Sequence, residues 1–147
     1  MADPEARYDE MIGKLKAGSQ KLTPQRLAIL RVLANSSDHP SVDDIHQKLA
    51  KDFPGISQAT VYRTIMMVKS LGQVLELGFP DGSNRYDGSK PDPHPHVICT
   101  RCKRIIDPNV SDFIDLPRKI AEANGFEMVS YRLDIFGVCP LCRNHDG

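Results

Sequence analysis

Residues 57–72 carry the sequence SQATVYRTIMMVKSLG, which follows a Phe-Pro-Gly turn and ends at a glycine. Apolar side chains recur there at helical spacing and predict a buried face made of Val61, Ile65 and Val68. The remaining positions are expected to share the outer faces: Gln58, Ala59, Thr60, Tyr62, Arg63, Thr64 and Met67. The stretch therefore predicts an amphipathic helix with a polar surface that another molecule can contact.

Two more helices are expected before this one, and a hairpin after it. Thr23 can cap a helix that has Pro24 at its first position, with a buried face of Leu27, Leu30, Leu33 and Ala34. Ser41 opens a second helix with a capping-box-like start, and its apolar positions are Val42, Ile45 and Leu49. Residues 74–77 and 84–86 are apolar-polar segments joined by Pro80, Asp81, Gly82 and Ser83, a hairpin pattern.

Three helices followed by a hairpin predict a winged helix-turn-helix domain, in which the third helix enters the major groove of DNA. On the exposed side of that helix, Tyr62 and Arg63 are the expected groove contacts. The alternative is a three-helix interaction module that makes no contact with DNA.

The charge of the chain is balanced in total but not in distribution. The formal net charge is zero, yet no acid lies between Met11 and Arg31, a stretch that contains Lys14, Lys16 and Lys21. A local basic face can supply the phosphate contacts that dominate DNA affinity, and these three lysines are the expected phosphate contacts. Solvated helix faces would give the same pattern.

A proline-rich segment divides the 147 residues into two domains. We expect a winged-helix DNA-binding domain at 1–86, a hinge at 87–93, and a dimerisation and metal-binding domain at 94–147. No apolar stretch is long enough to cross a bilayer and the N-terminus lacks an export signal, so a cytoplasmic protein is expected.

The second half predicts an α/β domain, so the fold class of the whole chain is α+β. Short strands are expected around residues 97–98 and 104–106. A helix capped by Asp115 should follow, with Leu116 and Ile120 facing inward and an end at Asn124-Gly125. In residues 129–136, Val129, Tyr131, Leu133 and Ile135 alternate with polar residues, which predicts a strand with one apolar face.

The cysteines form two Cys-x-x-Cys pairs, Cys99/Cys102 and Cys139/Cys142, with 36 residues between the pairs. Four thiolates saturate zinc and leave no open position, so the pattern predicts a closed, structural Zn(II) site. Two independent redox dithiols, unpaired structural cysteines and a zinc-thiolate redox switch are the alternatives.

A second candidate metal site begins at His94-Pro95-His96, where two imidazoles at i, i+2 of an extended segment lie on the same side. Imidazole with carboxylate suits Fe(II), Mn(II) or Zn(II). Composition alone does not distinguish Asp87 and Asp107 from ordinary surface carboxylates, or His39 from an ordinary loop residue.

The sequence resembles the ferric uptake regulator (Fur) superfamily over nearly its whole length, and most closely the peroxide-sensing (PerR) branch. The matching stretches are residues 22–26 (LTPQR), 38–40 (DHP), 43–45 (DDI), 59–63 (ATVYR), 85–87 (RYD), 94–99 (HPHVIC), 102–107 (CKRIID) and 137–139 (GVC) with Cys142.

The resemblance implies a homodimeric repressor that binds palindromic double-stranded DNA, and not an enzyme. It implies that the four cysteines hold zinc and that Fe(II) or Mn(II) occupies a regulatory site made of His39, Asp87, His94, His96 and Asp107. Peroxide-sensing members carry aspartate at the position of Asp107, and residues 129–136 lack the histidine that iron-sensing members tend to have there. In that branch peroxide oxidises a ligand histidine, and by matched position His39 and His94 are the targets.

The sequence alone is compatible with three other functions. An iron- or other metal-responsive repressor could use the same scaffold without sensing peroxide. A non-haem iron oxygenase could use His94, His96 and a carboxylate as a facial triad, but the helices of residues 23–71 would then have no role. A zinc-containing protein–protein adaptor would bind no DNA.

Overall fold

The computed structural model describes residues 3–79, 82–109 and 111–145. It divides into two compact units, Met1–Asp92 and Pro93–Gly147. Mixed helices and sheets in both units confirm the α+β fold class. None of the helices in the described ranges combines the length and apolar character that a bilayer crossing requires.

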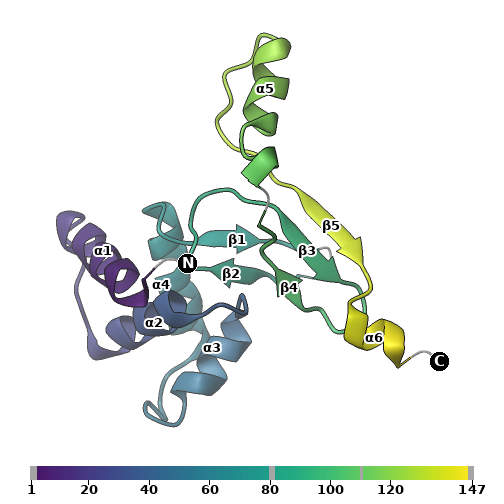
Figure 1. Cartoon of the computed structure of the whole chain (residues 1–147). Helices are drawn as coiled ribbons and strands as arrows, with labels where there is room; N and C mark the ends of the chain where they lie inside the picture. The colour runs from purple at the N-terminus through teal and green to yellow at the C-terminus, as the bar shows by residue number, and fades with distance from the viewer. Residues whose placement is uncertain (1–2, 80–81, 110, 146–147) are drawn as a thin grey trace. The chain divides into compact units, whose positions relative to one another are not determined.

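Figure 1 labels the elements of both units. The first unit contains α1 (Pro4–Ala17), α2 (Pro24–Asn35), α3 (Val42–Leu49), α4 (Gln58–Ser70), β1 (Leu75–Leu77) and β2 (Arg85–Asp87). The second contains β3 (His96–Cys99), β4 (Ile105–Ile106), the short 3-10 helix η1 (Ser111–Phe113), α5 (Leu116–Ala123), β5 (Asp134–Gly137) and α6 (Pro140–Asn144).

The three predicted helices of the first unit are confirmed, and each begins at a capping side chain. The hydroxyl oxygens of Thr23 and Ser57 accept hydrogen bonds from the backbone N–H groups three residues later. Ser41 forms a reciprocal capping box with Asp44. With the hairpin of β1 and β2, α2 to α4 form the predicted winged helix.

One helix was missed. Helix α1 precedes the other three, with Asp3 as its N-cap and Pro4 at its first position. Met11 and Leu15 are fully buried in the core of this unit. The capping residue, the proline and this apolar spacing are the signals that could have predicted it.

Two burial predictions in this unit need correction. Leu27 is only half-buried, and Ile29 is fully buried on α2 instead. Thr64 was expected on an outer face of α4 but is 2% exposed. Its hydroxyl donates a hydrogen bond to the carbonyl oxygen of Thr60 at 2.9 Å, which satisfies the polar group inside the core.

The hairpin is confirmed, with β1 antiparallel to β2 and Glu76 opposite Tyr86. Pro80 and Asp81 of the expected turn lie outside the described residues. An isolated bridge between Ser41 and Arg85 places the segment before α3 beside β2. The N–H of Tyr86 also donates to the carbonyl oxygen of Pro40 at 3.0 Å.

The second unit is built on a three-stranded sheet in the order β4-β3-β5. The predicted strands at 97–98 and 104–106 are confirmed as β3 and β4, which are antiparallel. Strand β5 runs parallel to β3, with Asp134 opposite His96 and Gly137 opposite Cys99.

Helix α5 is confirmed where it was predicted. The predictions that Asp115 caps it and that one of its faces is buried were wrong. Asp115 has helical rather than extended backbone angles and makes no capping hydrogen bond. Leu116 and Ile120 are 43% and 57% exposed, because α5 stands clear of the sheet of its own unit (Figure 1).

The strand predicted at 129–136 is much shorter than expected. Only Asp134–Gly137 forms a strand, β5. Val129 is 96% exposed and Ile135 is 50% exposed. The alternation of residue types is present, but in the described part of the chain residues 129–133 belong to no strand of the sheet. The Leu133 carbonyl oxygen accepts a hydrogen bond from the His96 N–H at 3.0 Å, where the pairing of β5 with β3 begins.

Gly88 provides a test of the packing beside β2. A Cβ at this position would lie 2.6 Å from the carbonyl oxygen of Leu33, which is backbone and cannot move aside cheaply. We expect Gly88→Ala to lower the free energy of unfolding by about 1–3 kcal/mol, measured by urea denaturation. Gly13→Ala is the control, since Gly13 lies within α1 with open space around its Cβ position. That change should raise stability by roughly 0.5–1 kcal/mol. Equal effects of the two changes would contradict the steric argument.

Candidate metal centres

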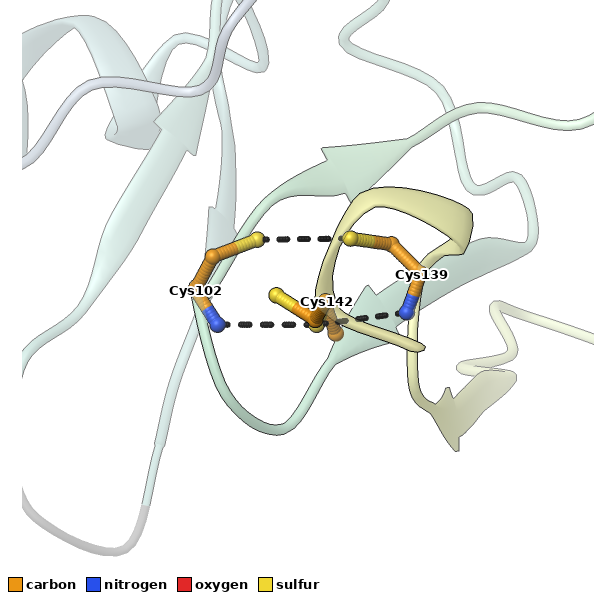
Figure 2. Close-up of side chains that lie close together, drawn as sticks. Cys102, Cys139 and Cys142 are labelled. Atoms are coloured by element: carbon orange, nitrogen blue, oxygen red, sulfur yellow. Dashed lines mark hydrogen bonds between the residues drawn. The ribbon is translucent and has the colours of Figure 1, made fainter. Parts of the chain in front are cut away.

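The four cysteines gather into one cluster in the second unit. The Sγ atoms of Cys99 and Cys142 are 3.8 Å apart, and those of Cys102 and Cys139 are 3.7 Å apart. All four sulfurs lie within 4.8 Å of one another. Sulfurs bound to tetrahedral zinc at about 2.3 Å lie roughly 3.8 Å from each other, so the cluster fits a structural zinc site. Figure 2 shows three of these side chains converging.

The sheet register explains how the distant pairs meet. Cys99 ends β3 and lies opposite Gly137 of β5, two residues before Cys139. The N–H of Thr100 donates to the carbonyl oxygen of Gly137 at 2.8 Å, which extends this pairing into the first cysteine turn. Cys139 is the N-cap of α6, and Cys142 lies within that helix. The intervening residues thus return the second pair to the first.

Backbone N–H groups stabilise negative charge at Cys99. Those of Cys139 and Cys102 point at its sulfur from 3.4 and 3.5 Å, and they lower the pKa of Cys99 to about 5. A hydrogen bond with Cys139, together with burial, raises the pKa of Cys142 to about 12. Zinc binds the thiolate form of cysteine, and these N–H groups favour that form at Cys99.

His39 and Asp87 form a buried pair in the first unit. The Nε2 of His39 lies 3.1 Å from Oδ2 of Asp87, and both side chains are 2% exposed. The other carboxylate oxygen, Oδ1, accepts hydrogen bonds from the N–H groups of Ser89 and Lys90 and from the Ser89 hydroxyl. The two oxygens of Asp87 therefore have different partners.

In the second unit, two imidazoles converge on one carboxylate. The Nε2 atoms of His94 and His96 lie 3.3 and 3.4 Å from the same oxygen, Oδ1 of Asp107. His96 is fully buried on β3, and its Nδ1 lies 3.7 Å from Asp134 of β5. Nitrogen and oxygen ligands held about 2.1 Å from one metal lie roughly 3.0–3.4 Å from each other, so this donor set suits a divalent transition metal.

The structure thus groups the five candidate regulatory ligands by unit. His39 lies with Asp87 in the first, and His94, His96 and Asp107 lie together in the second.

The predicted DNA contacts all lie at the surface of the first unit. Tyr62 is 51% exposed on α4, and Arg63 beside it is exposed as well. Exposed side chains also include those of Lys14 and Lys16 on α1 and of Lys21 before α2. Arg31, from the same acid-free stretch, lies over the ring of Tyr8 at 3.6 Å and pairs with Glu5, so its charge is already engaged.

Two arginines that the sequence analysis did not predict contact the backbone next to His39 and Asp87. Arg7 of α1 is 6% exposed, and its guanidinium donates to the carbonyl oxygens of Gly88 and Gln73 at 2.9 Å. Arg85 donates to the carbonyl oxygens of Asp38 and His39. Only Arg85 had a sequence signal, because it belongs to the RYD stretch that contains Asp87.

Comparisons with known proteins agree with this geometry. The model of the ferric uptake regulator family matches residues 17–136. The chain is 37% identical over 140 residues to the peroxide-responsive repressor PerR of Staphylococcus aureus, covering 95% of this chain and 94% of the relative.

Solved structures give the same result. The ferric uptake regulator of Helicobacter pylori superposes with a TM-score of 0.81 at 20% identity, over 96% of this chain and 94% of that one. That of Francisella tularensis with iron gives a TM-score of 0.72 at 31% identity, over 84% and 94%. This chain therefore belongs to the ferric uptake regulator family, a family of metal-responsive transcriptional regulators.

Proposed function

We propose that this protein is a metal-dependent, DNA-binding repressor that senses hydrogen peroxide. The observation that carries the proposal is the convergence of His94 and His96 on an aspartate, Asp107, where iron-sensing members of the family usually carry glutamate. The identity to a peroxide-responsive repressor over nearly the whole chain supports it.

In this proposal, His39, Asp87, His94, His96 and Asp107 share one Fe(II) or Mn(II) ion. Residues 87–93 serve as a hinge between a DNA-binding domain at 1–86 and a dimerisation domain at 94–147. Ligands from both sides of a hinge let the ion select one arrangement of the two domains. The ion's differential affinity for that arrangement is what makes DNA binding metal-dependent.

When bound, Fe(II) supplies the redox chemistry that activates hydrogen peroxide. His39 or His94 is then oxidised to 2-oxo-histidine: a ring carbon gains one oxygen atom from peroxide, and the second oxygen leaves as water. The imidazole loses two electrons and the peroxide gains two. A ligand altered in this way binds metal more weakly, so the domains are released and the protein leaves DNA.

The thiolate cluster has a different role in the proposal. Cys99, Cys102, Cys139 and Cys142 hold Zn(II) permanently, since four sulfurs leave no open position for substrate or solvent. The ion stabilises the second domain and takes no part in sensing peroxide.

A homodimer acting on a palindromic operator in the cytoplasm completes the proposal. Large apolar side chains on and around α5 and β5 are at least half exposed, among them Ile120, Phe126, Val129, Ile135 and Phe136. Patches of this kind mark protein interfaces, and here we assign them to a second copy of the chain. Two recognition helices, one per chain, would then read the two half-sites.

The alternative is an iron- or other metal-responsive repressor that does not sense peroxide. The likeness to an iron-bound ferric uptake regulator at 31% identity favours it, because the same scaffold serves both functions.

Peroxide treatment of the iron-loaded protein separates the two functions. We expect one added oxygen on His39 or His94 by peptide mass spectrometry, together with release from operator DNA in a mobility-shift assay. The manganese-loaded protein is the control and should gain no oxygen, since the oxidation requires iron. If the iron-loaded protein still binds operator DNA after peroxide treatment, the result contradicts peroxide sensing and supports the metal-responsive repressor.

The proposed groove contact and the proposed phosphate contacts should affect DNA affinity in different ways when they are mutated. Arg63→Ala should weaken specific binding by about 1–3 kcal/mol while changing non-specific binding less, since a groove contact reads bases. Replacing Lys14, Lys16 or Lys21 by Ala should weaken all binding and reduce the salt slope by about 1 per phosphate contact. Fluorescence anisotropy with operator and scrambled DNA at several salt concentrations measures both. Equal losses on the two DNAs for Arg63→Ala would contradict its assigned role.

Zinc removal tests the structural site. We expect Cys139→Ser to lower the zinc content and to destabilise the second domain severely, because structural zinc contributes on the order of 10 kcal/mol in isolated zinc modules. Elemental analysis and thermal unfolding followed by circular dichroism measure the two effects. Thr100→Ser, an exposed change within the first cysteine turn, is the control and should retain zinc. A fully folded, zinc-free Cys139→Ser protein would refute the structural role.

A further inference from the structure

The backbone of His39 has an uncommon conformation. Its φ angle is +53°, in the left-handed region that residues with a Cβ seldom occupy. The segment around it is a loop between α2 and α3, so helix hydrogen bonds do not hold it in place. Such a conformation persists only where surrounding contacts impose it.

The guanidinium of Arg85 supplies contacts of this kind on two successive carbonyl groups. Its Nη2 donates to the carbonyl oxygen of Asp38 at 2.8 Å, and its Nε donates to that of His39. The planar fork of an arginine suits two acceptors at once, whereas lysine has a single nitrogen. The backbone pairing of β2 with Pro40 and Ser41 continues the same attachment along the chain.

Arg85 and Asp87 lie two residues apart on β2, so their side chains leave the same face of the strand. One holds the backbone of His39, and the other meets its imidazole, with 3.1 Å between Nε2 and Oδ2. Strand β2 therefore holds both the backbone and the imidazole of His39.

We propose that Arg85 is a positioning residue of the regulatory metal site, holding His39 in its left-handed conformation so that the imidazole is ready to bind metal beside Asp87. This inference rests on the proposed function, in which His39 and Asp87 are ligands of one ion. Arg85 touches neither the ion nor peroxide in this role; it lowers the cost of ordering the ligand when the metal arrives.

The test measures Mn(II) affinity of the full-length, zinc-loaded chain by electron paramagnetic resonance of unbound Mn(II). Arg85→Met should weaken Mn(II) binding roughly 10–100-fold, the usual effect of removing a group that orients a ligand. Arg85→Lys should fall between Arg85→Met and the natural protein. Arg26→Met is the matched control, because Arg26 also donates to a backbone carbonyl, that of Lys21 at 2.8 Å, in a different loop of this unit. It should leave Mn(II) affinity unchanged.

A second measurement separates positioning from general stability. Urea unfolding without Mn(II) reports what each arginine contributes to the fold, while Mn(II) affinity is measured on folded protein. Wild-type Mn(II) affinity in every folded Arg85 variant would overturn the proposal, whatever happens to the urea midpoint. Should Arg85→Met not fold, Arg85→Lys decides: weaker Mn(II) binding supports the proposal and wild-type binding overturns it.

His39→Ala distinguishes this failure from failure of the proposed function. If the natural protein and His39→Ala bind Mn(II) equally, His39 is not a ligand and the five-residue site itself is wrong. If His39→Ala binds Mn(II) more weakly while the Arg85 variants bind it as the natural protein does, the result supports His39 as a ligand and contradicts only the positioning role of Arg85.

Discussion

The buried carboxylate of Asp87 is the constraint around which the first unit is arranged. A carboxylate removed from water is costly unless its oxygens are hydrogen-bonded or paired. Here the two oxygens are divided: Oδ1 accepts from the N–H groups of Ser89 and Lys90, and Oδ2 faces the imidazole of His39. The first contact holds the backbone that follows β2, and the second orients the imidazole of a proposed metal ligand. One side chain thus links the start of the proposed hinge to the proposed site.

The residue before Asp87 ties the same strand to the proposed recognition helix. The hydroxyl of Tyr86 donates to Glu76 at 2.7 Å, and Lys69, at the end of α4, pairs with the other oxygen of that carboxylate. Burial raises the pKa of Glu76, but the hydrogen bonds from Lys69, Tyr86 and Asn84 together lower it further, so the group stays ionised. Burial and the neighbouring Glu76 raise the pKa of Tyr86 well above its usual value. Strand β2 therefore connects the buried His39–Asp87 pair to α4 within one packed unit.

Local signals predicted most of this fold, and long-range contacts account for what was missed. Thr23, Ser41 and Ser57 are the N-caps of three helices. Such a cap can be predicted because it depends only on residues close by in the sequence. The roles of Arg7 and Arg85 depend on partners 81 and 47 positions away, respectively, which no local pattern contains. The buried faces expected for Val129 and Ile120 were wrong for another reason: the two side chains are 96% and 57% exposed among the described residues. An apolar pattern indicates that a face tends to be covered, but it does not say by which part of which molecule. The clustering of the four cysteines could be predicted from the two Cys-x-x-Cys motifs and the preference of zinc for four thiolate ligands.

Strand β3 connects the two kinds of metal chemistry in the second unit. Its first residue, His96, belongs to the nitrogen-and-oxygen group, and its last, Cys99, belongs to the thiolate cluster. Parallel pairing with β5 sets Asp134 opposite the histidine and Gly137 opposite the cysteine. A zinc ion that joins Cys99 to Cys139 and Cys142 therefore fixes the register of these strands from one end. Because a one-residue slip would carry Asp134 to the other face of the sheet, the same zinc keeps that carboxylate beside the imidazole at the other end. In the proposed function, the structural zinc site thus helps to hold the ligands of the regulatory site in place.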